Sequence, residues 1–520
     1  MKRLYILIST IFLCINLHSH PWKPSHYVII DTDGGIDDIR AISMMLASPD
    51  VRVLAITVSP GALSAGNAFI KVRSLLNSYY HEGIPAGINR VSNFTSPEFP
   101  IALNAKWGTE DGIDPGKAPD FLSVISEIIS TEKTKISFIC LGSMSTAWNS
   151  LMNIPDFGRQ VKDFIWSADG ADDKAGFNYS IDKKSSVAML KQEIPVKIVR
   201  KYNLNNAVFY NSEFIKTLSN INTRYAARIS LFIDNEASAD HKFYHEATDE
   251  MTAVFLHYPE LFLCKTLGNI SDCVPSDLKG LHESVIRILK GETVAGNQVI
   301  REFPVDPAFY FDDISGSVTE IIKKYGKDEW QSGVLANELH RHLGVFAIIG
   351  VKMGIRAREY FNTGVDEFKV TSFAGSTPPV SCFNDGLQVS TGATPGHGLL
   401  TVIKDQAASP SAEFTYLNRK IRITLKPEIT EKITAELKEI NFVHGLDTNT
   451  YWELVRKNSI KYWLGMDRHE IFEIIDPPTP QGGLSQSSPP PESLPRFGGG
   501  LGVGQNRHGL EIRASEGELK

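Results

Sequence analysis

Four aspartates lie within eight residues near the start of the chain, in the segment Asp31-Thr32-Asp33-Gly34-Gly35-Ile36-Asp37-Asp38. Carboxylates this close repel one another, and a helix N-terminus relieves only about 0.3–1 kcal/mol per charge. A bound cation would remove the repulsion. Aspartate oxygens are hard ligands that suit Ca²⁺ or Mg²⁺, and no His or Cys lies close enough in sequence to suggest zinc here. We therefore predict a cation site, the alternative being a set of solvated helix caps and turn formers.

The elements around this segment must hold its carboxylates together. The apolar residues 27–30 precede it, and residues 39–47 follow with apolar positions at helical spacing, so the order is strand, glycine turn, helix. In an open parallel sheet such a junction lies at the carboxyl end of a strand, where ligands bind. We expect the aspartates at that edge.

The same octet resembles, position for position, the Asp-x-Asp-x-Gly-x-Asp-Asp signature of the nucleoside hydrolases, the inosine-uridine-preferring family. The resemblance extends over about residues 27–323. It implies that Asp33 and Asp38 bind Ca²⁺, and that Asp37 is both a ligand and the general base for the attacking water.

Three later segments resemble this family in order and spacing. Ser145 lies in a turn after an apolar strand, where the resemblance implies that its backbone carbonyl binds Ca²⁺. Asn178 matches the asparagine of a Glu-Phe-Asn segment that contacts ribose. Asp249, ahead of Met-Thr-Ala-Val-Phe, matches the late aspartate that completes the calcium site.

Other positions depart from the family pattern. Gly176 replaces a glutamate, Ala62 a ribose-binding asparagine, and Thr248 a histidine found in many members. Residues 107–112 lie where a pocket histidine is common. The metal-binding residues are thus kept while several sugar and base contacts are altered, which indicates either a changed substrate or binding without efficient turnover.

The chemistry implied is cleavage of an N-glycosidic bond. Calcium can hold a water and the cis-diol of a ribose together while Asp37 takes the proton of the water and Asn178 binds a ribose hydroxyl. The acid for the leaving group stays open, because Thr248 occupies its usual position. His241 or His245 could serve, or both could be ordinary surface residues.

We predict an enzyme, an N-glycosidase that hydrolyses a ribosyl bond in nucleosides or related compounds and depends on Ca²⁺. One alternative is a non-catalytic protein that binds a ribosyl ligand and keeps the metal site. Another is a metal-dependent enzyme whose chemistry lies in a second domain.

That second domain carries motifs of its own. Residues 339–344 are Leu-His-Arg-His-Leu-Gly, and residues 381–398 place a Cys, an Asp and a Gln before a Thr-Gly-Ala-Thr-Pro-Gly turn. Both resemble the FmdE family, which is named after formylmethanofuran dehydrogenase. Two imidazoles and a thiolate suit Zn²⁺ with an open fourth position, so we expect a second metal at His340, His342 and Cys382. The alternative is a buried cysteine with solvated histidines.

The order of elements predicts the fold class. Strands and helices alternate up to about residue 323, and the strands are continuously apolar, which is typical of a mainly parallel sheet covered on both faces. We expect an α/β, nucleoside-hydrolase-like domain followed by an α+β, FmdE-like domain. In the first the expected strands are 27–30, 51–58, 136–140, 163–168 and 196–199, and the expected helices 39–47, 63–80, 146–152 and 185–190. In the second we expect one long helix over 334–361, strands at 368–371, 399–404, 413–416 and 420–425, and helices at 430–440 and 451–462.

The chain ends and the composition bear on location and partners. Residues 1–20 have the positive start and apolar core of a secretory signal, which predicts a periplasmic or secreted protein. The predicted domains are 26–325 and 328–476, followed by a Pro/Gly/Ser-rich disordered tail over 477–520. A net charge of −7 gives no basic footprint for nucleic acid and does not suggest binding to an anionic membrane. The expected partner is a small nucleoside or ribosyl substrate, and a homo-oligomer stays open.

The cysteines leave one question. Cys264 and Cys273 could form a disulfide in an oxidising compartment, or could be two unpaired thiols. Cys140 ends an apolar run, so we expect a buried strand thiol.

Overall fold

The computed structural model describes residues 24–91, 94–95, 97–171, 176–203, 208–232, 246–292, 300, 302–404 and 407–476. The predicted signal peptide and the predicted disordered tail lie outside the described residues. No helix in the described ranges is long and apolar enough to cross a membrane. The domain boundaries stay predictions.

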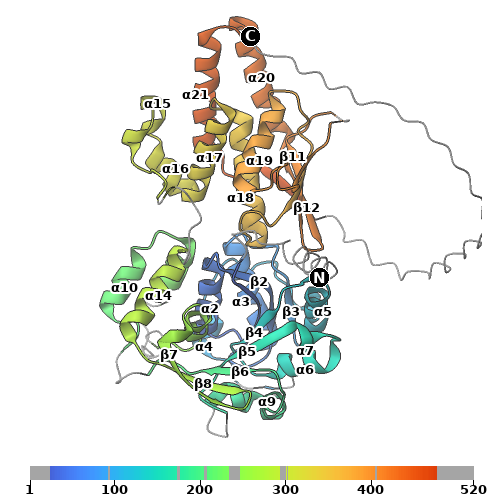
Figure 1. The fold of residues 1–520 in the computed structure, drawn as a ribbon, viewed down its shortest axis with the longest axis vertical. Coiled ribbons are helices and arrows are strands. Elements are labelled where there is room, and N and C mark those ends of the chain that lie inside the picture. The colour runs from blue at the N-terminus through green and yellow to red at the C-terminus, as the bar shows by residue number, and fades with distance from the viewer. Residues whose placement is uncertain are drawn as a thin grey trace, which may run out of the picture. The chain divides into compact units, whose positions relative to one another are not determined.

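A mainly parallel sheet of eight strands organises the first part of the chain (Figure 1). Its strand order is β3-β2-β1-β4-β5-β6-β8-β7, and every neighbouring pair is parallel except β7 with β8. This confirms the predicted α/β class and the five expected strands. The bounds are β1 His26–Thr32, β2 Val51–Val58, β3 Ala86–Ile88, β4 Ile136–Cys140, β5 Val161–Ser167, β6 Val196–Val199, β7 Phe262–Leu267 and β8 Ile270–Pro275.

Helices cover both faces of this sheet because successive strand residues point to opposite sides. In β1, Val28 and Ile30 join one buried cluster, and Ile29 joins the other. The first cluster takes in α2 Ile36–Ala47, α3 Ala65–Ser78, α4 Pro100–Asn104, α10 Ser212–Ser219, α11 Arg224–Ser230, α13 Glu250–His257 and α14 Leu278–Lys290. The second takes in α5 Phe121–Thr131, α6 Ser145–Asn153, α7 Phe157–Gln160, α8 Gly176–Ile181 and α9 Lys183–Leu190.

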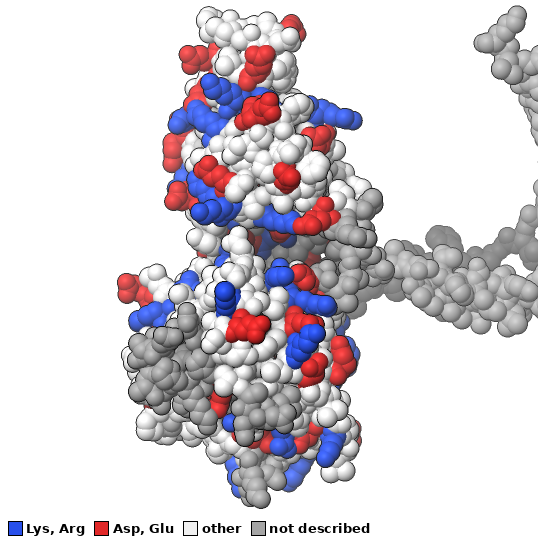
Figure 2. Space-filling model, turned by 90° about the vertical axis from the view of Figure 1, so that its left-hand side faces the viewer, with Lys and Arg blue, Asp and Glu red and all other residues white. Residues whose placement is uncertain are grey.

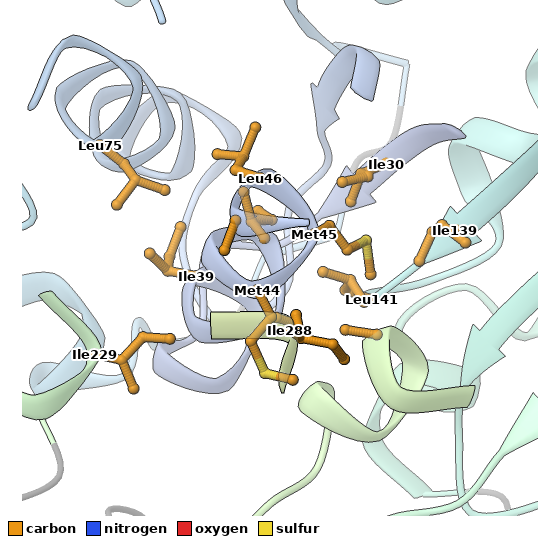
Figure 3. Close-up of a cluster of buried hydrophobic side chains, with 14 of the residues drawn as sticks. Ile30, Ile39, Met44, Met45, Leu46, Leu75, Ile139, Leu141, Ile229 and Ile288 are labelled. Carbon is orange, nitrogen blue, oxygen red and sulfur yellow. The ribbon is translucent and has the colours of Figure 1, made fainter. Parts of the chain in front are cut away.

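Helix α2 is buried nearly all round, which fixes the start of the helix in space. Figure 3 shows its side chains between the strands, represented by Ile30, and the outer helices, represented by Ile229 and Ile288. Met44 and Met45 are fully buried in this cluster. The aspartates in the first turn of α2 therefore sit on a rigid element.

The second part of the chain is an α+β arrangement, as predicted. A five-stranded sheet has the order β10-β9-β11-β12-β13, with bounds β9 Lys369–Ser372, β10 Leu400–Val402, β11 Ser411–Tyr416, β12 Arg419–Leu425 and β13 Phe472–Ile475. The helices are α17 Lys327–His340, α18 Val345–Phe361, α19 Phe383–Thr391, α20 Pro427–His444 and α21 Asn449–Gly465. Two shorter helices, α15 Asp312–Ser315 and α16 Val318–Tyr325, bury their apolar residues against α17 and α21.

The expected long helix over 334–361 is wrong, because the chain breaks it into α17 and α18. Arg341 adopts a left-handed conformation with φ 69°, and the Gly344 amide then donates to Asn337 Oδ1 over 2.9 Å. A non-glycine residue in that conformation ends a helix. The break places His340 and His342 in one turn.

The cysteines have definite states. Cys264 and Cys273 pair across β7 and β8 and form a disulfide, while Cys140 is a buried free thiol at the end of β4, as expected. On the face drawn in Figure 2, the described acidic and basic side chains are interspersed.

Candidate functional site

Three carboxylates from distant parts of the sequence meet at the carboxyl end of β1. Asp37, Asp38 and Asp249 each offer an oxygen, and these oxygens all lie within 4.8 Å of one another. The first two belong to the first turn of α2, and Asp249 directly precedes α13, which packs against α2. Among the residues that the structure describes, this is the one group of three ligand-type side chains arranged to hold a metal ion.

The electrostatics of this group favour a cation. Asp249 Oδ1 is buried and has no hydrogen-bond partner, and burial, followed by repulsion from Asp38 and Asp37, raises the pKa of Asp249 well above its usual range. Burial and the charges of Asp38 and Glu250 raise the pKa of Asp37 to about 7. Glu250 itself is engaged, because buried Arg40 pairs with it at 2.5 Å. The three carboxylates therefore fit Ca²⁺, a hard cation that accepts several oxygens.

Hydrogen bonds from β1 hold Asp38 in place. The Thr32 hydroxyl donates to Asp38 Oδ1 over 2.6 Å, and the Asp33 amide donates to the same oxygen over 3.1 Å. The first aspartate of the motif has another role. Asp31 is fully buried and accepts from the hydroxyls of Thr57 and Ser59, which ties β1 to β2.

Asp33 lies beside the group of three carboxylates and interacts with it electrostatically. Burial first, then the charge of Asp38, raises the pKa of Asp33 well above its usual range. Two glycines make room for its carboxyl group: a Cβ at Gly61 would fall 2.1 Å from Asp33 Oδ2, and one at Gly142 would fall 3.2 Å from Asp33 Cβ. Gly34 has φ +85°, which the tight turn between β1 and α2 requires.

The other predicted residues lie at the ends of neighbouring strands. Asn178 Nδ2 donates to the carbonyls of Leu141 (2.5 Å) and Ser167 (3.0 Å), which follow β4 and end β5. Its amide hydrogens are thus used within the protein, and its oxygen remains as an acceptor. Ser145 is the first residue of α6, and its backbone carbonyl accepts a hydrogen bond from Asn149 Nδ2 over 2.8 Å. The role of this carbonyl as a calcium ligand stays a prediction.

Asp169 is a residue that the sequence reasoning missed. Gly176 has φ +82°, and a Cβ there would fall 2.5 Å from Asp169 Oδ2. The backbone of Gly176 thus lies directly against a carboxylate. The signal was available, since Asp169 follows the strand predicted at 163–168 and so belongs to the same edge of the sheet.

The structure also places other residues that depart from the family pattern. Ala62 is buried, and its backbone hydrogen-bonds Asp33. Trp107 is fully buried with its ring 3.9 Å from that of Phe232, so it belongs to the core. The Thr248 amide donates to Glu250 Oε2 over 3.0 Å. His241 and His245 lie outside the described residues.

A cavity of about 470 Å³ opens at the carboxyl ends of β2 and β3. Gly61, which touches Asp33, lines this cavity together with Asn89, Arg90 and Phe94. The Phe94 ring stands edge-on to that of Phe177, with centroids 6.5 Å apart. Nothing in the sequence pattern had singled out Asn89, Arg90 or Phe94.

The residues predicted to hold zinc do not form a metal group. His340 Nδ1 donates to Asp385 Oδ2 over 2.7 Å, and the His340 and His342 rings lie 4.2 Å apart. The hydrogen bond to Asp385, followed by contact with the Cys382 thiol, raises the pKa of His340 to about 10. Within the described ranges, His340, His342 and Cys382 do not bring three ligand atoms within 4.8 Å of one another. The structure therefore does not support the zinc prediction.

Comparison with family models gives two matches. The model for inosine-uridine preferring nucleoside hydrolase matches residues 28–320, and the model for FmdE, molybdenum formylmethanofuran dehydrogenase operon, matches residues 339–472.

Two curated proteins agree with the first match, and two solved structures are reported with them. A non-specific ribonucleoside hydrolase, RihC, from Salmonella paratyphi A is 22% identical over 250 residues, which cover 46% of this chain and 81% of that protein; the RihC of Salmonella typhi is also 22% identical, with 80% of it covered. A plant nucleoside hydrolase structure, PpNRh1, has 18% identity and a TM-score of 0.43, covering 51% of this chain and 99% of that one. A purine-preferring ribonucleoside hydrolase from Gardnerella vaginalis has 16% identity and a TM-score of 0.41, with 51% and 98% covered.

Proposed function

Because the chain belongs to the inosine-uridine preferring nucleoside hydrolase family, we propose that it hydrolyses the N-glycosidic bond of a ribonucleoside or a related ribosyl compound. One observation carries this proposal. Asp37, Asp38 and Asp249 converge within 4.8 Å at the carboxyl end of β1, and Asp249 leaves a buried oxygen without a partner. A structural role would not need three repelling carboxylates around an unsatisfied oxygen.

Calcium dependence is part of the proposal. Asp37, Asp38 and Asp249 would hold Ca²⁺, with Asp33 and the Ser145 carbonyl as further ligands. The ion would supply a fixed point for a water and for the cis-diol of the ribose. The protein holds these ligands on rigid elements, since α2 is buried on all sides and Thr32 fixes the Asp38 carboxylate.

The proton of the attacking water would pass to an aspartate. Asp37 is the residue that the motif implies, and a bound Ca²⁺ would keep its carboxylate ionised and able to accept a proton. Asp33 is a second candidate, because its carboxyl group lies beside the group of three and outside it. Separate substitution of Asp37 and of Asp33 distinguishes the two candidates for the general base.

Recognition of the sugar would use acceptors at the same edge. Asn178 presents its amide oxygen, since its amide nitrogen is held by two backbone carbonyls. Asp169 offers a carboxylate close to Gly176, which has no side chain of its own. The cavity lined by Arg90 and Phe94 would receive the leaving group.

The test is release of free base from inosine and uridine by the purified chain. We expect base and ribose in equal amounts, loss of activity with EDTA, and recovery with Ca²⁺. Asp38→Asn should be inactive, and Asp447→Asn, at an exposed turn residue outside the cavity, should match the parent. If ribose binds in the presence of Ca²⁺ but no base is released from any nucleoside or nitrophenyl riboside, the non-catalytic alternative is favoured.

We also propose that the chain is exported, from its N-terminal signal pattern. The Cys264–Cys273 disulfide supports this, because such bonds persist in oxidising compartments. Fractionation of cells that produce the full chain should place it in the periplasm or the medium, and recovery from the cytoplasm in uncleaved form would count against export.

A further inference from the structure

The turn between α17 and α18 presents an imidazole to the start of α19. His340 is the last residue of α17, and the left-handed Arg341 turns the chain there. The Gly344 amide closes the turn by donating to Asn337. This geometry is fixed by the backbone, so His340 does not depend on a flexible loop for its position.

Asp385 orients that imidazole. Its Oδ2 accepts from His340 Nδ1 over 2.7 Å, and Gln388 Nε2 donates to its other oxygen over 3.4 Å. Because the pKa of His340 is about 10, the ring is protonated at neutral pH and Nε2 carries the second proton. His340 Nε2 is buried and has no hydrogen-bond partner in the protein by strict geometry. An aligned imidazolium of this kind can hold the proton of a thiol and pass it to a leaving group.

A free thiol completes the group. Cys382 directly precedes α19 and is three residues from Asp385, so the two side chains share one face at the start of the helix. The thiol is half-buried and forms no disulfide. The N-terminus of α19, nine residues long, favours negative charge on the sulfur.

We propose that Cys382, His340 and Asp385 form a thiol, imidazole and carboxylate triad that hydrolyses an acyl ester or thioester, in a site separate from the nucleoside hydrolase carboxylates. The proton of the thiol rests on His340 Nε2, and the sulfur attacks the acyl carbonyl as the thiolate. A carbon–sulfur bond forms, the bond to the leaving alcohol or thiol breaks, and His340 gives its Nε2 proton to that leaving group. Water then attacks the acyl-cysteine while the neutral His340 takes a proton from the water, the carbon–sulfur bond breaks, and a carboxylic acid is released with the sulfur again a thiolate beside the protonated His340.

Space for the acyl compound lies next to the triad. A cavity of about 530 Å³ is lined by His342, whose ring contacts that of His340, and by Trp452 and Arg341. Tyr451 lies beside this cavity, with its ring 5.0 Å from that of Trp452, and Tyr451 and Cys382 pack against the same hydrophobic cluster. Asp385 acts through His340 and is a positioning residue.

The experiment is acetylation of the full chain by p-nitrophenyl acetate. We expect a burst of nitrophenolate with one acetyl group on Cys382, located by mass spectrometry of peptides. Cys382→Ser should remove this acetyl group, and His340→Gln should slow its formation by roughly 10²-fold or more. His397→Gln is the matched control, because His397 also lies near an aspartate, at 3.4 Å from Asp366 Oδ1, and should acetylate at the parental rate.

Asp385 is tested by a pair of variants. Asp385→Asn should slow acetylation about as strongly as His340→Gln without changing the melting temperature, and Asp385→Glu should restore part of the rate. Equal acetylation in the parent and in His340→Gln, or an acetyl group found elsewhere than on Cys382, overturns the triad. One zinc ion per chain in the purified protein, with Cys382 acetylated only after chelation, also overturns it and assigns the residues to a metal site.

Discussion

Gly61 lies directly against Asp33: a Cβ at position 61 would fall 2.1 Å from the Asp33 Oδ2 atom. No side chain can be accommodated there unless the carboxylate moves. The glycine therefore sets the position of a carboxylate that touches the proposed calcium site.

Gly61→Ala should for this reason reduce hydrolysis strongly while the protein still folds. A displacement of about 1 Å at a catalytic group can cost roughly 10²-fold in rate. The control is Gly465→Ala at the end of α21, where a new Cβ would meet nothing within 4 Å. Steady-state kinetics should separate the two variants, and a fully active Gly61→Ala would show that Asp33 has no part in catalysis.

Removal of calcium should destabilise the protein, because the buried carboxylates of Asp37, Asp38 and Asp249 then repel one another. Ligand at about 100 times its Kd contributes about 2.7 kcal/mol, which corresponds to a change in Tm of roughly 4 °C for a domain of about 300 residues. Scanning calorimetry of the calcium-loaded protein with and without EDTA measures this. An identical Tm under both conditions would exclude a structural cation at this site.

Asp37→Asn should abolish hydrolysis, since an amide cannot accept the proton of the attacking water. Loss of a general base removes on the order of 10²–10⁴-fold in kcat. Asp33→Asn is the comparison, and the titration of Ca²⁺ by each variant shows whether metal binding was lost instead. A variant that binds Ca²⁺ normally yet has lost kcat identifies the base; an Asp37→Asn enzyme with parental kcat would move that role to Asp33.

Substrates with a good leaving group should be favoured. Thr248 cannot protonate a departing base, and general acids typically contribute about 10²–10⁴-fold. We expect p-nitrophenyl riboside to be cleaved with a kcat/KM at least about 100-fold above that of inosine or uridine. Equal or higher kcat/KM on inosine would indicate an acid elsewhere in the cavity.

His26 should contribute a loss of stability as the pH drops below neutrality. Burial first, and then the charges of His257 and Lys162, lower the pKa of His26 to about 4. The charge of Asp163 has a smaller effect that raises this pKa, and the charge of Lys197 has a smaller effect that lowers it. Since its unfolded pKa is 6.5, the unfolded chain binds more protons between pH 6.5 and 4, and stability is lost as pH falls through that window. Discounted for partial exposure, the effect is about 1–2 kcal/mol.

His26→Gln should flatten this part of the pH profile. The measurement is the difference in unfolding free energy between pH 7 and pH 5 from urea titrations, with exposed His397→Gln as the control. An unchanged pH dependence in His26→Gln would mean that other groups carry the acid sensitivity.

The sequence alone determined the α/β class and most of the elements that carry the site. Strands and helices follow from local patterns, such as the continuous apolar run Val51–Val58, and the Asp-rich octet is contiguous. Patterns of this kind need no knowledge of distant contacts. The wrong prediction of one long helix over 334–361 has a local cause as well. The helical periodicity continues on both sides of Arg341, so the pattern does not indicate the left-handed conformation of that residue.

Tertiary structure decided what lies together. The meeting of Asp249 with Asp37 and Asp38 depends on the packing of α13 against α2, which joins segments more than two hundred residues apart. The closeness of Asp169 to Gly176 depends on how the residues just after β5 lie against the start of α8, and the pairing of His340 with Asp385 depends on the approach of α19 to the end of α17. Side-chain distances across such contacts are set by packing of the whole core, which no local pattern encodes. For this reason the residue types predicted the chemistry, but only the fold determined which residues lie close enough together to perform it.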